Sequence, residues 1–536
     1  MRSSALAPST LFAGLLLAAA GLGTTPMALA QTPAAGQTEV RRIEVDLADA
    51  GAPLDRSFNL SVGADYPGTT MRPENLAQLK TAVDELGFRY IRFHDIFHDA
   101  LGTVRVIDGR TVYDWTRIDQ LYDALLGMGI KPFVELGFTP AAMKTSDQTI
   151  FYWKGNTSHP KPEAWRALID AFVRHLRNRY GAEEVRSWYF EVWNEPNLAG
   201  FWERGDQKAY FELYENTART IKAIDPRLRV GGPSTAGAAW VPELLAFAAE
   251  RGLPVDFVTT HTYGVEGGFL DEYGQDDNKL STNPDAVTAD VRKVRREIDA
   301  SKFAGVPLFF SEWSASYNPR DPVHDSYISA AYILGKLKAT RAYSQGMSYW
   351  AYSDLFEEPG PPPAPFHGGF GLINREGIPK AAYFAYRYLN LLRGREVRVG
   401  DDQVLAATAD GRTGVVLWNW TQPEQKASNR PFFTKLLPAQ PAAPAELSFA
   451  GLAPGSYRVT VRRTGFEAND AHGRYLQMGS PKDLSAGQLA ELRALTQDKP
   501  ETDSTIRVGS DGRYTLRVPM RTNDVIFAQL EPAERN

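Results

Sequence analysis

Short apolar runs alternate with longer amphipathic stretches from residue 57 to residue 392, and this alternation constrains the fold more than any other feature. Eight of the apolar runs have the length of buried strands, and helical hydrophobic periods separate them. The predicted strands are Phe58–Val62, Phe88–Phe93, Lys131–Leu136, Trp188–Trp193, Leu228–Gly232, Asp256–Thr260, Leu308–Glu312 and Met347–Tyr352. The predicted helices include Glu74–Leu86, Trp165–Arg179, Gln207–Ile224, Ala286–Ile298 and Ser326–Arg341.

Eight strands, each followed by a helix, predict an α/β fold in which residues 57–392 form a (β/α)8 TIM barrel. A doubly wound open sheet is the alternative. It is disfavoured because no Gly-rich phosphate-binding turn follows the first strand.

The pattern changes after Leu392, where alternation of period two between Gly, Pro and Asp turns predicts an accessory β-sandwich over residues 393–536. Its predicted strands are Val404–Ala407, Thr413–Trp420, Tyr457–Arg463, Thr505–Val508, Tyr514–Pro519 and Val525–Leu530. Arg41–Leu47 also has a strand pattern, so residues 31–56 are expected to complete the sandwich from the N-terminal side. The Pro/Ala-rich stretch Pro438–Pro444 is expected to be a loop.

Residues 1–30 are typical of a secretory signal peptide. Arg2 gives a basic start, Leu11–Leu22 is an apolar run that is short for a membrane span, and Ala28–Ala30 fits a small-x-small cleavage site. The expected location is the periplasm or the exterior of a bacterium, with no membrane attachment after cleavage. An uncleaved N-terminal anchor is the alternative.

Composition excludes several classes of site and partner. The 536 residues contain no cysteine, which rules out disulfides, thiolate nucleophiles, Cys-bound zinc and iron–sulfur clusters. A formal net charge of -5 gives no electrostatic reason to bind nucleic acid. His94 and His98 have the spacing of a helical zinc pair, but they follow a strand and lack a third ligand, so no metal and no cofactor are expected.

Two glutamates stand where the chemistry of a barrel is located, at the carboxyl ends of strands. Glu195 follows the run Trp188–Trp193, and Glu312 ends the run Leu308–Glu312. Burying two carboxylates at one barrel mouth is costly unless they share a task. Hydrolysis of a glycosidic bond needs such a pair, one group to protonate the leaving oxygen and one to attack or to activate water.

The longer stretches around these glutamates resemble glycoside hydrolase family 39, and within it the bacterial β-xylosidases. They are WYFEVWNEPNLAGFW (Trp188–Trp202), SEWSASYNPRDPVHDSY (Ser311–Tyr327), SYWAYSDLFEE (Ser348–Glu358) and FHGGFGLINREGIPK (Phe366–Lys380). The likeness extends to MGSP (Met478–Pro481) and RTNDVIFAQLEP (Arg521–Pro532), so it spans nearly all of the chain after residue 30.

The resemblance implies roles for individual positions. Glu195 is similar to the general acid/base and Glu312 to the nucleophile of this family, Asn194 to the residue that binds the sugar 2-hydroxyl, and Tyr263 to the tyrosine that orients the nucleophile. The other positions that match residues around the sugar are Arg92, His94, His261, Trp350, Glu357, Glu358, Phe151 and Phe201. Structural alternatives are core packing for His261, Tyr263 and Trp350, barrel closure for Arg92, and a solvated charge pair for Glu357 and Glu358.

The function that these residues predict is a retaining exo-glycosidase that removes xylose from the non-reducing end of β-1,4-xylo-oligosaccharides or aryl β-xylosides. The charge of Glu312 is expected to hold up the pKa of Glu195 in the first step. Rival activities are an α-L-arabinosidase, an endo-acting exopolysaccharide glycosidase and, more weakly, an α-L-iduronidase. The rival from another class is a carbohydrate-binding protein with an inactive barrel, although both carboxylates are present. A homo-oligomer is left open.

Overall fold

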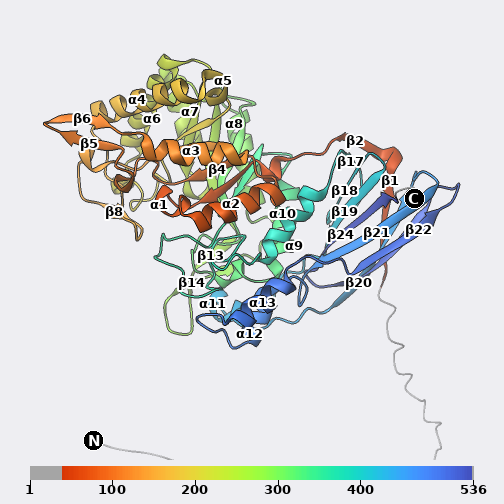
Figure 1. Cartoon of the computed structure of the whole chain (residues 1–536). Helices are drawn as coiled ribbons and strands as arrows, with labels where there is room; N and C mark the ends of the chain where they lie inside the picture. The colour runs from red at the N-terminus through yellow and green to blue at the C-terminus, as the bar shows by residue number, and fades with distance from the viewer. Residues whose placement is uncertain (1–38, 534–536) are drawn as a thin grey trace, which may run out of the picture. The chain divides into compact units, whose positions relative to one another are not determined.

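The computed structural model describes residues 39–533 and contains a closed barrel of eight parallel strands, which confirms the predicted fold class (Figure 1). In chain order the barrel strands are β3 (Ser61–Ala64), β4 (Tyr90–Phe93), β7 (Lys131–Leu136), β10 (Tyr189–Val192), β11 (Arg229–Thr235), β12 (Phe257–Tyr263), β15 (Leu308–Ser314) and β16 (Gly346–Tyr349). The predicted signal peptide lies outside the described residues. Among the described residues, the structure has no helix with the length and apolar character of a membrane span.

A helix follows each barrel strand and covers the outside of the barrel. The main helices are α2 (Pro73–Leu86), α3 (Thr116–Met128), α4 (Pro162–Tyr180), α6 (Gln207–Ile224), α7 (Val241–Arg251), α8 (Thr288–Asp299), α9 (Ile328–Thr340) and α10 (Ala381–Leu391). Proline is the first residue of α2 and of α4 and the second residue of α7, positions at which a backbone N–H would have no partner within the helix. All eight predicted strands and all five named helices are present, with their ends shifted by a few residues.

The interior of the barrel is layered. Its lower layer is a closed apolar cluster of Leu60, Phe133, Tyr189, Phe257 and Phe309. Alternate residues of a strand point to the same side, so the positions two residues further along face inward as well. On β7 and β10 these positions hold Glu135 and Glu191, and from β4 Arg92 reaches both. A charged layer therefore separates the apolar base of the barrel from its open carboxyl end.

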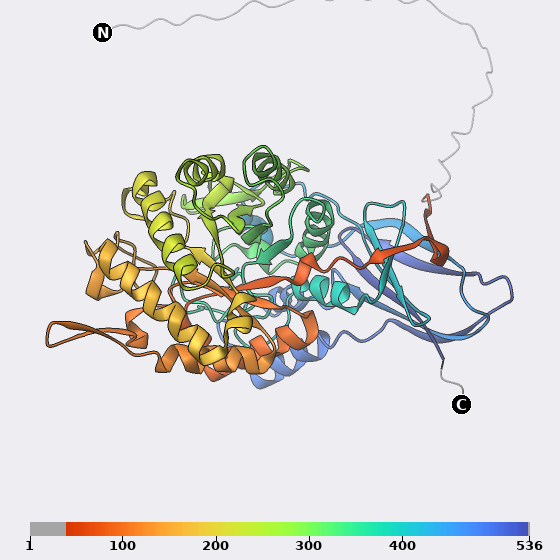
Figure 2. The same cartoon turned by 90° about the horizontal axis from the view of Figure 1, so that it is seen from above.

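Two sheets form the sandwich. The larger has the order β2-β17-β18-β19-β24-β21-β22, and the smaller has the order β1-β20-β23. Their bounds are β1 (Arg41–Asp46), β2 (Ala50–Pro53), β17 (Arg395–Val397), β18 (Val404–Ala409), β19 (Arg412–Trp418), β20 (Pro441–Ala450), β21 (Gly455–Thr464), β22 (Thr502–Val508), β23 (Tyr514–Arg521) and β24 (Val525–Pro532). The predicted N-terminal strand is present as β1, which pairs in parallel with β20. In Figure 2 the red N-terminal segment passes from the sandwich strands into the barrel.

The loop prediction for Pro438–Pro444 is wrong in part, because β20 begins at Pro441. The pairing of β20 with β23 shifts its register between Ala442 and Ala445, and the pairing with β1 starts only at Ala445. Pro441 and Pro444 therefore lie where part of the ladder is unpaired, and proline is tolerated in a strand at such an irregular position.

The all-β prediction for the C-terminal region also missed the short helix α11 (Asn429–Phe433) and a pair of helices, α12 (Ala471–Gln477) and α13 (Ala486–Leu495). Residues of both helices pack in one apolar cluster with Phe366 and Ile378 of the barrel. Trp418 and Phe527 of the sandwich belong to the main core of the barrel, and the described residues from Val40 onward form one compact unit. The accessory sheets are thus built into the barrel rather than tethered to it.

Candidate active site

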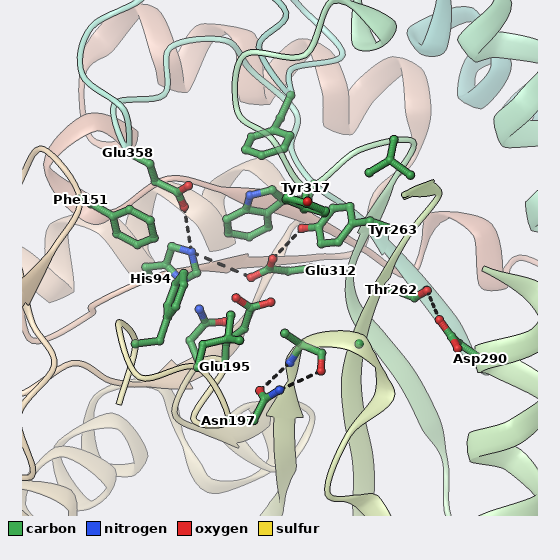
Figure 3. A pocket seen from close by; sticks show the side chains of 18 residues that line it. His94, Phe151, Glu195, Asn197, Thr262, Tyr263, Asp290, Glu312, Tyr317 and Glu358 are labelled. Atoms are coloured by element: carbon green, nitrogen blue, oxygen red, sulfur yellow. Dashed lines mark hydrogen bonds and ion pairs between the residues drawn. The ribbon is translucent and has the colours of Figure 1, made fainter. Parts of the chain in front are cut away.

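Glu195 and Glu312 face one cavity of about 630 Å³ at the carboxyl end of the barrel (Figure 3). Glu195 lies in the loop after β10, where Trp193 and Glu195 both have positive φ angles and the Glu195 N–H donates to the Ser234 carbonyl. Glu312 lies on β15 itself. Oxygens of the two carboxylates lie within 4.8 Å of each other and of a ring nitrogen of His261. The sequence prediction of two opposed, buried carboxylates therefore matches the geometry.

Arg92 holds the nucleophile candidate from below. Its guanidinium donates to Glu312 Oε1 at 2.7 Å and to Glu191 Oε2 at 2.5 Å, and it is fully buried. Burial by itself would lower the pKa of Arg92, but the charges of Glu191, Glu135 and Glu312 more than offset this and raise it. Arg92 does not line the cavity, so it acts on Glu312 and not on a ligand.

Arg92 also sets the orientation of Asn194. Its Nη2 donates to Asn194 Oδ1 at 2.7 Å, which leaves the Asn194 amide nitrogen free to face the cavity that Asn194 lines. An amide nitrogen in that position is a hydrogen-bond donor for a sugar hydroxyl.

Glu195 is held by His261. Nδ1 of His261 lies 2.9 Å from Glu195 Oε1, and its Nε2 lies 3.4 Å from Ser234 Oγ. Burial lowers the pKa of His261 to about 4, so its ring is neutral near pH 7. Burial also raises the pKa of Glu195 to about 7, against the lowering effect of His94 and Arg92. We expected the charge of Glu312 to raise the pKa of Glu195; in the structure the cause is desolvation.

Tyr263 and His94 flank Glu312. The Tyr263 hydroxyl donates to Glu312 Oε2 at 2.8 Å, while His94 Nε2 lies 3.9 Å from Glu312 Oε1. His94 Nδ1 contacts Glu135 at 2.8 Å, and its Nε2 contacts Glu358 at 3.1 Å. Burial would lower the pKa of His94, but Glu135 and Glu358 raise it well above its usual value. Burial raises the pKa of Glu358 to about 8. One end of the cavity thus presents an imidazolium and a carboxyl group.

Aromatic side chains wall the same end. Trp350, Phe151 and Phe201 all line the cavity, and the His94 ring lies 4.8 Å from Trp350 and 5.6 Å from Phe151. Gly63 of β3 makes room for the indole, because a Cβ atom there would lie 2.1 Å from a Trp350 ring carbon. The aromatic positions named from the sequence therefore meet at one wall.

Glu357 is placed outside the cavity. Its carboxylate is paired with Arg72, with Nη2 to Oε2 at 3.0 Å, and Glu357 is not among the lining residues. Glu358, the next residue, does line it. The sequence treated the two glutamates as one gripping pair, whereas the structure brings only Glu358 to the cavity.

Sequence reasoning missed Glu135 and Glu191, the acids of the charged layer. Both are fully or almost fully buried in strands that otherwise read as apolar, Val134-Glu135-Leu136 and Phe190-Glu191-Val192. That position could have pointed to the charged layer, because a carboxylate inside a buried strand requires a cation nearby. Arg92 lies at a position of its strand that also points into the barrel. Asn197, Leu198, Thr262, Asp290 and Tyr317 are further lining residues that were not named.

His94 and His98, which have the spacing of a zinc pair, are engaged in hydrogen bonds with the protein. His98 Nε2 donates to the Trp153 carbonyl and its Nδ1 accepts from the Ala100 N–H, so both of its ring nitrogens are occupied. Within residues 39–533, the one group of three side chains with metal-like spacing is Glu195, His261 and Glu312. Of these, His261 is bonded to Glu195 at 2.9 Å and Glu312 to Arg92 and Tyr263, and His261 supports Glu195 without lining the cavity itself.

Comparison with known proteins identifies the family. The model of glycosyl hydrolases family 39 matches residues 41–515. A beta-xylosidase of Geobacillus stearothermophilus is 36% identical over 489 residues, which is 89% of this chain and 93% of that protein.

Two solved structures agree with this. The GH39 enzyme of Xanthomonas axonopodis pv. citri is 64% identical, with a TM-score of 0.92 over 92% of this chain and 98% of that chain. A monomeric beta-xylosidase of Caulobacter crescentus CB15 is also 64% identical, with a TM-score of 0.91 over 92% of this chain and 100% of that chain. The chain therefore belongs to glycosyl hydrolase family 39.

Proposed function

We propose that this protein is a retaining β-xylosidase that releases xylose from the non-reducing end of β-1,4-xylo-oligosaccharides. The observation that carries the proposal is the opposed pair Glu195 and Glu312, whose nearest oxygens lie within 4.8 Å. Retaining glycosidases have carboxyl groups about 5–5.5 Å apart, whereas inverting enzymes leave about 6.5–9.5 Å for a water molecule. The short separation in this cavity supports the two-step route.

In the first step Glu312 attacks the anomeric carbon and the bond from that carbon to the glycosidic oxygen breaks. Glu195 gives its proton to the departing oxygen. The arrangement suits this division of labour, because Arg92 and Tyr263 each bond one oxygen of Glu312 and so favour its anion. Burial raises the pKa of Glu195 to about 7, so about half of the molecules carry its proton in neutral solution.

In the second step Glu195, now a carboxylate, takes a proton from a water molecule. The water oxygen bonds to the anomeric carbon, the ester bond to Glu312 breaks, and the sugar leaves with its original configuration. We expect the Asn194 amide nitrogen to donate to the 2-hydroxyl, a contact that would strengthen in both transition states, and the bond from Arg92 to Asn194 Oδ1 supports this role.

The chemistry of the cavity supports a neutral pentose as the sugar. None of the described residues that line it is an arginine or a lysine, while Glu195, Asp290, Glu312 and Glu358 are carboxylic acids. An iduronate carboxylate would find no cationic side chain other than His94, which already contacts Glu135 and Glu358. The relatives named as beta-xylosidases support xylose. The aromatic side chains gathered at one end of the cavity support removal of terminal units.

The purified protein is expected to hydrolyse 4-nitrophenyl β-D-xyloside and to release β-xylose first, which proton NMR distinguishes from α-xylose before mutarotation. Reduced xylohexaose should yield xylose from the first minute. A first burst of xylobiose and xylotriose would indicate an endo-acting enzyme. Turnover of an α-L-arabinoside alone would move the assignment to the arabinosidase, and α-xylose as first product would reject retention.

The pH dependence of kcat/KM should report Glu195. The protonated acid is the active form, so kcat/KM on xylobiose is expected to fall as pH rises through about 7, approaching tenfold per pH unit above it. 2,4-Dinitrophenyl β-xyloside is the matched control, because its leaving group needs no proton and this alkaline decline should be absent. An identical alkaline decline with both substrates would show that a group other than the acid is titrating.

A further inference from the structure

The cavity has two chemically different ends, with the catalytic pair between them. Figure 3 shows His94, Phe151 and Glu358 at one end, and Thr262 and Asp290 at the other. If the first end holds the sugar to be released, the leaving group must occupy the second. That end is formed by the loop after β10, the start of the loop after β11, the end of β12, and the first turn of α8.

Most polar side chains at the second end are already committed to the protein. Asn197 exchanges two hydrogen bonds with the backbone of Ala236, at 3.0 and 2.9 Å. The Tyr317 hydroxyl donates to Asn278 Oδ1 at 2.8 Å. The Thr262 hydroxyl donates to Asp290 Oδ2 at 2.6 Å. The second N–H of the Asn197 amide is therefore the one donor that these three side chains leave for a ligand, and both hydroxyl oxygens can still accept.

Asp290 is the exception, because only one of its two carboxylate oxygens accepts a hydrogen bond from the described residues. Its Oδ2 accepts from Thr262, whereas its Oδ1 has no hydrogen-bond partner and its carboxylate has no ion pair among residues 39–533. Asp290 lies in the first turn of α8, where the unsatisfied N–H groups of the helix favour an anion. Leu198 and Tyr317, which are 40% and 51% exposed, line the same cavity and offer apolar surface for a sugar ring.

We propose that Asp290 determines leaving-group specificity by accepting a hydrogen bond from a hydroxyl of the departing sugar. This inference rests on the proposed function and extends it. Because the Asp290 carboxylate and the two hydroxyl oxygens of this end are acceptors, a neutral, hydroxyl-rich sugar is favoured there. A leaving group that carries a carboxylate is disfavoured by the like charge of Asp290. An aryl leaving group without hydroxyls gains nothing from Asp290.

The test compares kcat/KM for xylobiose and for 4-nitrophenyl β-xyloside in Asp290→Ala. A hydrogen bond to a charged group corresponds to a loss of about 10- to 100-fold with xylobiose, and less than about twofold is expected with the nitrophenyl substrate. Asp299→Asn, a change at the exposed far end of the same helix, is the control and should alter neither value. In Asp290→Asn, the relative rate with a xylobiose that carries glucuronic acid on its reducing unit should rise.

Equal losses with both substrates would show that Asp290 only supports the fold, and an unchanged value with xylobiose would show that no such bond forms. Either result overturns the inference while leaving the xylosidase assignment in place. A wild-type protein that hydrolyses neither substrate would overturn the proposed function, and the inference with it.

Discussion

Glu312→Ala is expected to lower kcat/KM with 4-nitrophenyl β-xyloside by 10⁴-fold or more, on the order of 5 kcal/mol of transition-state stabilisation. Without the carboxylate no glycosyl ester can form, whatever the quality of the leaving group. The substitution leaves a space on the face of the sugar that Glu312 occupied. Azide entering there would invert the anomeric carbon once, so the expected rescue product is α-xylosyl azide.

The measurement is the anomeric configuration of the azide product by proton NMR, alongside the rate. Glu312→Gln is the matched variant, since it keeps the shape and an acceptor for Arg92, its NH2 can donate to the Tyr263 hydroxyl, and it leaves no room for azide. Glu312→Gln should be as inactive as Glu312→Ala, and azide should not restore its activity. A β-xylosyl azide from Glu312→Ala would mean that the two carboxylates have been assigned in the wrong order. Unfolding temperatures of both variants separate lost chemistry from lost structure.

Glu195→Ala should behave differently, because the nucleophile is intact. With xylobiose a loss on the order of 10⁴-fold is expected, since its sugar leaving group needs a proton. With 2,4-dinitrophenyl β-xyloside the first step should survive, so the ester accumulates and kcat and KM fall together. Azide needs no base and should attack the ester, giving β-xylosyl azide after two inversions and raising kcat.

The same variant checks the origin of the pH profile. Loss of the alkaline decline of kcat/KM in Glu195→Ala would tie that decline to Glu195, whereas its persistence would assign the titration to another group, such as Glu358. Equal loss with xylobiose and with the dinitrophenyl substrate would contradict the role of Glu195 as proton donor.

The charged layer beneath the site gives the two buried carboxylates different surroundings. Two cations, Arg92 and His94, are shared among the carboxylates of Glu135, Glu191 and Glu312. Among the described residues, the Glu195 carboxylate forms no ion pair with either cation, and its side-chain hydrogen-bond partner is the neutral ring of His261. Burial therefore outweighs the lowering effect of His94 and Arg92 and raises the pKa of Glu195, whereas Glu312 accepts hydrogen bonds from Arg92 and Tyr263.

The eight-stranded barrel, the sandwich and the place of the catalytic pair could be predicted from the sequence, because each rests on a local pattern. Strands and helices differ in hydrophobic period over a few residues. Glu195 follows β10 and Glu312 lies near the end of β15, the fourth and seventh strands of the barrel in chain order. Parallel strands in a closed barrel bring their carboxyl ends to one mouth. Local order therefore implied that two residues far apart in the chain would meet.

Only the tertiary structure decided what neighbouring side chains do. Glu357 and Glu358 are adjacent in sequence, yet one pairs with Arg72, 285 residues away, and the other with His94, 264 residues away. In the same way, α12 and α13 form where apolar surface of the barrel is available to cover them. These outcomes depend on which distant surface each side chain meets, and no local period encodes that.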